Sequence, residues 1–127
     1  MKPGLTAGYS VTIEAVVTRE MFAQFEGKMV HPTYSTVMMI YHMEWASRQI
    51  ILPFLEEHEE GMGLSVSAKH ILPAREGSKL NIKAVLTEKK DNKIITDVFV
   101  INDTKLIGTG EVTQVILPKA KIKSMLA

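Results

Sequence analysis

The chain has 127 residues, of which 46% are hydrophobic and 23% charged, the balance of one ordinary globular domain with its own core. Fifteen basic and fourteen acidic side chains leave a net charge of +1, so we expect no nucleic-acid partner. The absence of cysteine excludes disulfides, thiolate nucleophiles and cysteine metal sites.

No apolar run approaches the roughly 20 residues that cross a bilayer, and the start MKPGLTAGYSVT lacks the apolar segment of a signal peptide. We therefore expect a soluble cytoplasmic protein with no membrane partner. The whole chain, residues 1–127, is predicted to be a single domain with its core at about 8–117 and a basic tail at 118–127.

The first predicted elements are a strand and a short helix. Residues Ser10 to Thr18 alternate between apolar and polar, which predicts a strand with Val11, Ile13, Ala15 and Val17 on one face. Thr18 is a suitable cap for a short helix over residues 19–26, which Gly27 would end. The apolar stripe of this helix would contain Phe22 and Phe25.

The longest helical segment runs from about Thr36 to Glu57, with Ser35 or Thr36 as its N-cap. Pro53 is expected to kink or shorten it. The apolar residues of this helix cover nearly every side, which is typical of a helix that is enclosed by other elements.

The remainder of the chain alternates as β-strands, with turns at KKDNK and NDTK that join three strands into an antiparallel meander. Gly108 and Gly110 lie two apart in the last strand, where missing side chains permit bending or close backbone approach. The predicted fold class is therefore α+β, with one antiparallel sheet curling around the long helix. Since one sheet cannot cover the whole helix, we expect a homodimer, which could pair further into a tetramer.

Glu44 is unusual because it lies within the apolar run MMIYHMEWA. One interpretation is an ion pair with Arg48, which is four residues further along the same helix. The other is a half-buried functional carboxylate, since a desolvated carboxylate has a raised pKa and can act as a base or nucleophile.

Three other residues have both a structural and a functional interpretation. His70 shares the apolar face of its strand, where a histidine is either a hydrogen-bonded core residue or a catalyst. Thr36 is either an N-cap or a site hydroxyl, and Gly63 is either a helix stop or a site residue. No histidine pair has ligand spacing, so no metal site is expected.

The segments STVMMIYHMEWA, GMGLSVSAKH and IGTGEVTQVIL together resemble hotdog-fold thioesterases, and within them the fluoroacetyl-CoA thioesterase-like group. The resemblance runs from about Gly8 to Leu117. It implies a hotdog fold, in which an antiparallel sheet wraps one long central helix and a short lid helix covers the acyl pocket. It also implies a dimer, in agreement with the arrangement expected from periodicity.

The resemblance further implies the roles of individual residues. Glu44 matches a carboxylate that attacks the thioester or activates water, and Thr36 and His70 match its hydroxyl and imidazole companions. Gly63 matches a glycine whose N–H holds the thioester oxygen. Phe22 and Phe25 would lie in the lid.

The chain departs from the group in its last strand, where Val112 and Gln114 replace a histidine and an arginine. The prediction is an acyl-CoA thioesterase of unassigned acyl preference, which needs no cofactor beyond its CoA thioester substrate. The alternatives are a non-catalytic protein that binds an acyl-CoA or another apolar small molecule, and a hotdog dehydratase, whose local Asp and His pattern is not found. Lys119, Lys121 and Lys123 in the tail are either solvated or contact the CoA phosphates.

Overall fold

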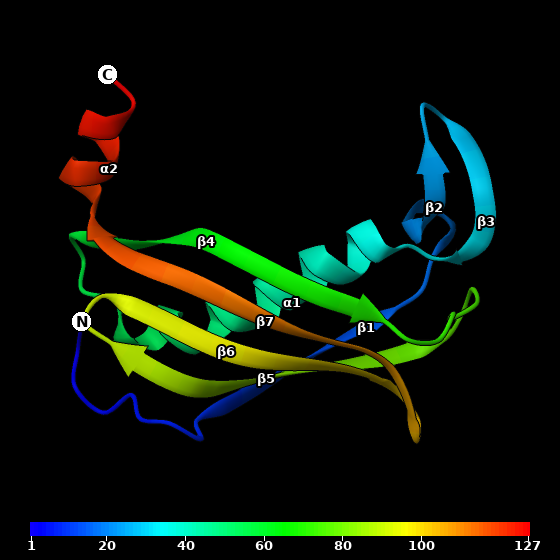
Figure 1. Cartoon of the computed structure of the whole chain (residues 1–127), viewed down its shortest axis with the longest axis horizontal. Helices are drawn as coiled ribbons and strands as arrows, with labels where there is room; N and C mark the ends of the chain where they lie inside the picture. The colour runs from blue at the N-terminus through cyan, green and yellow to red at the C-terminus, as the bar shows by residue number, and fades with distance from the viewer.

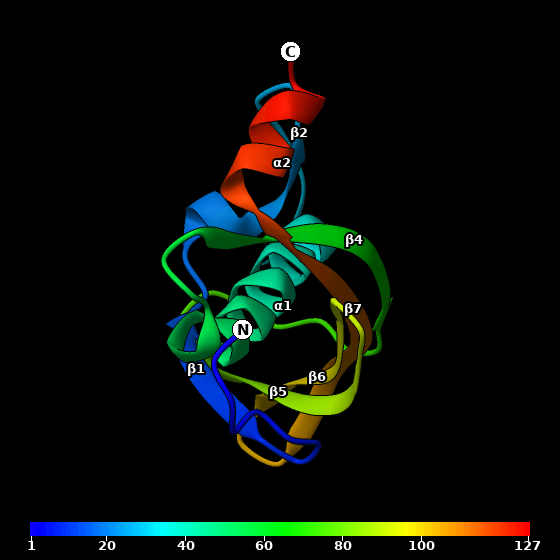
Figure 2. The ribbon, with the colours of Figure 1, turned by 90° about the vertical axis from the view of Figure 1, so that its left-hand side faces the viewer.

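The computed structural model describes all 127 residues. A five-stranded antiparallel sheet in the order β1-β5-β6-β7-β4 curls around the long helix α1 (Figures 1 and 2). Its strands are β1 (Ser10–Val16), β4 (Glu59–His70), β5 (Lys79–Lys90), β6 (Lys93–Asn102) and β7 (Lys105–Pro118). The predicted α+β arrangement, with one sheet wrapped around one helix, is confirmed.

Helix α1 spans Thr36–Ile51 and begins with Ser35 as its cap, whose side chain accepts a hydrogen bond from the Met38 N–H at 3.1 Å. The predicted end at Glu57 is wrong. A 3-10 turn over Leu52–Phe54 follows the helix, because Pro53 has no N–H to continue the α-helical pattern. Gly63, which was considered as a helix stop, therefore lies within β4.

The predicted short helix over residues 19–26 is also wrong. A 3-10 turn (Arg19–Met21) leads into β2 (Phe22–Phe25), which pairs with β3 (Lys28–Tyr34) as a two-stranded hairpin. Glu26 and Gly27 form the connection, and both have positive φ, at 54° and 77°. Two residues with positive φ suit the twist of a tight hairpin, so this glycine closes a hairpin and does not end a helix.

The two turns of the meander lie where the sequence predicts them, at Asp91 and Asp103, both with positive φ. The glycines of β7 let the sheet approach α1 closely. A Cβ on Gly110 would lie 2.7 Å from the sulfur of Met43 and 2.8 Å from the Ser67 carbonyl oxygen, and one on Gly108 would overlap Met39. Both methionines are fully buried, so the predicted close approach is confirmed.

One side of α1 stays uncovered by its own chain. Val37, Tyr41 and Trp45 follow each other at four-residue spacing and are 63%, 58% and 43% exposed. They flank the free edge of β4, where Leu64 is 56% exposed. The C-terminal tail forms a second helix, α2 (Lys119–Met125). None of the helices combines the length and apolar character needed to span a membrane.

Candidate active site

The predicted site residues lie along the line where α1 runs antiparallel to the edge strand β4. Two hydrogen bonds, Thr36 with His70 and Arg48 with Glu60, mark the ends of this line, and between them Glu44 faces Gly63. The antiparallel course explains why residues that increase in number along the helix meet residues that decrease in number along the strand.

Thr36 and His70 meet at the first turn of α1. The Thr36 hydroxyl and His70 Nδ1 share a hydrogen bond of 2.9 Å, so Thr36, the first residue of the helix, binds His70 while Ser35 serves as the N-cap. The other ring nitrogen, His70 Nε2, is buried and has no protein partner. Burial lowers the pKa of His70, which a backbone hydrogen bond at Leu72 partly offsets. The imidazole is therefore neutral near pH 7 and available for proton transfer.

A second hydroxyl–imidazole pair lies behind the first. Tyr34 at the end of β3 and His42 on α1 share a buried hydrogen bond of 2.6 Å between the phenol oxygen and Nδ1. Burial raises the pKa of the Tyr34 phenol and lowers the pKa of His42, so both groups are neutral. The Tyr34 ring also packs edge-on against His70, with centroids 6.0 Å apart. The pair thus fixes one side of the His70 imidazole.

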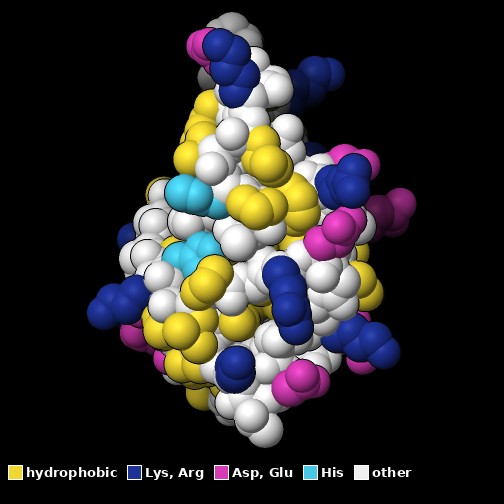
Figure 3. All heavy atoms as spheres, turned by 90° about the vertical axis from the view of Figure 1, so that its right-hand side faces the viewer, with side chains coloured by type: hydrophobic (Ala, Val, Ile, Leu, Met, Phe, Trp, Pro, Cys, Tyr) yellow, Lys and Arg dark blue, Asp and Glu magenta, His cyan; other side chains and the backbone are white.

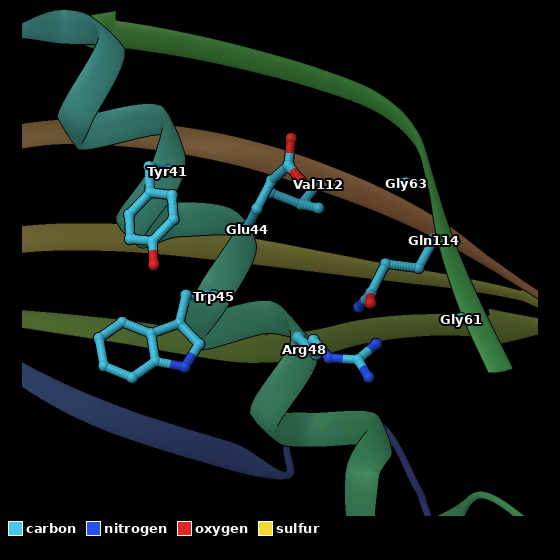
Figure 4. Close-up of a pocket in the computed structure, with 8 residues that line it drawn as sticks. All are labelled: Tyr41, Glu44, Trp45, Arg48, Gly61, Gly63, Val112 and Gln114. Carbon is cyan, nitrogen blue, oxygen red and sulfur yellow. The ribbon is translucent and has the colours of Figure 1, made fainter.

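Glu44 lies two helical turns beyond Thr36, at the rim of a pocket of about 320 Å³ (Figure 4). The pocket is lined by Tyr41, Glu44, Trp45, Arg48, Gly61, Gly63, Val112 and Gln114. The Glu44 carboxylate makes no hydrogen bond or ion pair, and a Cβ on Gly63 would stand 3.6 Å from its Oε2. In the single chain the residue is exposed, not half-buried as predicted.

The helical ion pair between Glu44 and Arg48 does not form. Arg48 instead binds Glu60 of β4 through both ends of its guanidinium, at 2.8 and 3.2 Å. This arginine, the Gly61 N–H and nearby Lys119 hold the pKa of Glu60 below its ordinary value. Glu44 is consequently left as an unpaired carboxylate facing the pocket.

The single chain brings the predicted residues together in two groups. Thr36 and His70 form one, and Glu44 and Gly63 form the other, separated by about 12 Å along the helix at 1.5 Å per residue. Phe22 is half-buried against the core, whereas Phe25 lies near the hairpin tip and is 64% exposed.

Sequence reasoning did not assign roles to Tyr34 and His42, and it treated Gln114 only as a departure from a pattern. Gln114 is buried and donates from Nε2 to the Ser47 carbonyl at 3.0 Å, so it ties β7 to α1 beneath the pocket. The signal for the Tyr34–His42 pair was the presence of two polar rings in apolar surroundings, where each needs a hydrogen-bond partner.

A family model of fluoroacetyl-CoA-specific thioesterases matches residues 17–120. The chain belongs to this family. No curated protein sequence matches it. Among solved structures, a hypothetical protein of Thermus thermophilus described as a thioesterase superfamily member is 44% identical, covers 99% of this chain and 93% of its own, and superposes with a TM-score of 0.95.

More distant structures show that the fold is the hotdog fold. A hot-dog-like protein from Thermanaerovibrio acidaminovorans is 14% identical, covers 94% of this chain and 89% of its own, and has a TM-score of 0.88. The fluoroacetyl-CoA thioesterase itself is 20% identical, covers 98% and 96%, and has a TM-score of 0.89. Variants of that enzyme have been solved with acetyl-CoA and with fluoroacetate and CoA.

Proposed function

We propose that this family member is an acyl-CoA thioesterase that works as a homodimer, with Glu44 as nucleophile or general base. The observation that carries the proposal is an unpaired carboxylate beside a pocket, on the same α1–β4 boundary as a neutral hydroxyl–imidazole pair. Family membership supports thioester chemistry, and the CoA ligands of the fluoroacetyl-CoA thioesterase support CoA as the leaving thiol.

The uncovered surfaces support a two-fold partner. The exposed stripe on α1 is centred on Tyr41, and the run of β4 from Gly63 to Lys69, exposed except at the half-buried Val66, is centred on that valine. A two-fold axis through both centres would pair β4 with its copy and cover the stripe. It would also bring His70 opposite Met62, next to Gly63, of the partner subunit.

The same axis would join the two separated groups. Glu44 of the partner subunit would face Thr36 and His70, so each dimer would hold two complete sites. The apolar neighbours from both copies would then remove water from a carboxylate that is exposed in the single chain, and a carboxylate with less water around it is a more reactive base or nucleophile. This arrangement supplies the half-buried setting that the sequence predicted.

In this site a water molecule or a Glu44 oxygen adds to the acyl carbon and forms a tetrahedral intermediate. When Glu44 adds, loss of CoA leaves a mixed anhydride, which water then hydrolyses to the free acid and the Glu44 carboxylate. The electrons of the breaking carbon–sulfur bond leave on the thiol of CoA. The proton lost by water passes through the carboxylate or the His70 imidazole to that sulfur, and Thr36 fixes the imidazole ring. The Gly63 N–H is the proposed donor to the carbonyl oxygen.

The test is hydrolysis of a panel of acyl-CoA esters by the purified protein, with release of free thiol as the measurement. We expect at least one ester to be hydrolysed, with one molecule of acid released for each molecule of free thiol. Thermal stabilisation by an acyl-CoA with no thiol release would instead favour the binding protein, because binding alone raises stability.

A further inference from the structure

Two protrusions extend past the free edge of β4, at opposite ends of α1. The β2–β3 hairpin rises beside the start of the helix, and α2 rises at the far end (Figures 1 and 2). Hydrophobic side chains gather on the face below the projecting hairpin tip (Figure 3).

Each protrusion lacks the cover that would stabilise it. Helix α2 has seven residues and buries none, with Met125 and Leu126 59% and 80% exposed. An isolated helix below about 12–15 residues is marginal in water. The hairpin exposes Phe25, Met29 and Val30, and an isolated two-stranded hairpin is marginal for the same reason.

We propose that α2 of each copy packs against the β2–β3 hairpin of its partner and holds that hairpin over the active site. The proposal rests on the homodimer of the proposed function. A two-fold axis at the centre of β4 exchanges the two ends of the edge, so it places α2 of one copy beside the hairpin of the other.

The chemistry of the two surfaces is complementary. The charged side chains of α2 are all lysines, at positions 119, 121 and 123. On the hairpin segment the charge of Arg19 is already paired with Glu76 at 3.5 Å. The remaining charged side chains are two acidic ones, Glu20 and Glu26, and one basic one, Lys28, so the hairpin has a net negative charge. The apolar residues at the end of α2 match the exposed aromatic and aliphatic residues of the hairpin, and methionine adapts readily to such contacts.

The contact has a consequence for the site because the hairpin is anchored beside the Thr36–His70 pair. The Ser35 N–H donates to the Met21 carbonyl at 2.8 Å, and Thr33 forms a bridge with Arg75. A hairpin braced from the partner therefore closes the entrance next to these residues. Helix α2 acts as a positioning element for this lid.

Cross-linking tests the contact directly, since the chain has no cysteine of its own. In the variant Lys28→Cys/Lys121→Cys a short bis-maleimide should join most of the protein into covalent dimers. Each single variant should stay monomeric on denaturing gels, because its two copies lie at opposite ends of the dimer. The matched control Lys28→Cys/Lys83→Cys, with its second cysteine on β5, should also stay uncross-linked.

A second readout follows the hairpin itself. Met125→Asp should make trypsin cleave after Lys28 several-fold faster, whereas Leu106→Asp, near the start of β7, should leave that rate unchanged. A dimer in sedimentation without the expected cross-link, a monomer, or equal cross-linking of the controls would overturn the proposal. Absence of thioester hydrolysis would refute the proposed function and leave the cross-link result unaffected.

Discussion

Replacing Gly63 by alanine places a methyl group in the pocket beside the proposed catalytic carboxylate. The added Cβ would stand 3.6 Å from Glu44 Oε2, which is ordinary van der Waals contact, and it would meet no other atom within 4 Å. The fold should therefore accept the change, and removal of a strand glycine favours the folded state by about 0.5–1 kcal/mol. We expect the urea midpoint to stay the same or rise slightly.

Activity should respond in the opposite direction. The methyl group occupies space where the thioester carbonyl would lie, and a misplacement of about 1 Å can cost roughly 100-fold in rate. We expect kcat/KM on the best acyl-CoA ester to fall by about that factor, equivalent to about 2.7 kcal/mol of transition-state stabilisation. Thiol release under steady-state conditions measures it.

Gly110→Ala is the matched control from the same sheet. Its Cβ would lie 2.8 Å from the Ser67 carbonyl oxygen, a backbone atom that cannot move cheaply, so unfolding free energy should fall by about 1–3 kcal/mol. If Gly63→Ala keeps full kcat/KM, the thioester does not bind beside Glu44. If Gly63→Ala destabilises the fold as much as Gly110→Ala does, the added methyl group does not fit in the space beside Glu44.

Three further predictions concern the polar pairs around the site. Tyr34→Phe leaves His42 Nδ1 buried without a partner and should cost about 1–3 kcal/mol in urea unfolding; an unchanged midpoint would contradict the hydrogen bond. Burial lowers the pKa of His42 and His70, so below the ordinary imidazole value of about 6.5 the unfolded chain binds protons first. Unfolding free energy should therefore fall as the pH drops from 6.5 toward 5, with a smaller slope in His42→Gln. Arg48 and Glu60 are 40% and 34% exposed, so a double-mutant cycle of Arg48→Met and Glu60→Gln should give a coupling of at most about 1 kcal/mol; a much larger value would show a dry ion pair.

The sheet and α1 followed from the sequence because their periodicities are local and strong. The hairpin did not, since Met21, Phe22 and Phe25 have a spacing that also fits a helical stripe. The hairpin forms because β2 pairs with β3 and because the two consecutive residues that join them, Glu26 and Gly27, adopt positive φ. Strand pairing depends on a second segment, so the spacing within residues 19–26 alone could not reveal it.

The partner of Arg48 was missed for a related reason. When residues 36–57 are taken as one helix, Glu60 lies in the acidic segment that follows its end. Glu44 is then the only carboxylate close enough to pair with Arg48. Because Pro53 ends the helix, the chain reverses, and Glu60 lies in β4, where its carboxylate accepts a hydrogen bond from Arg48 of α1. One misplaced boundary therefore changed which carboxylate remained free.

The geometry of the candidate site could not be predicted from the sequence. Thr36 and His70 are 34 positions apart, and their contact arises only from the antiparallel course of α1 and β4. Their assignment came from resemblance to a family, whose membership the family model shows. The split between the Thr36–His70 group and Glu44 had no signal in the sequence, because it depends on the three-dimensional path.

In the proposed dimer one copy supplies Glu44 to each site and the other supplies Thr36 and His70. Glu44→Gln and His70→Ala should each abolish hydrolysis, and the two inactive proteins can be unfolded together in urea and refolded as a mixture. About half of the resulting dimers carry one of each chain and would regain one intact site of two, so thiol release should return to about a quarter of the parental rate. A mixture that stays as inactive as its components would contradict the shared site, and full activity in Glu44→Gln alone would remove Glu44 from the mechanism.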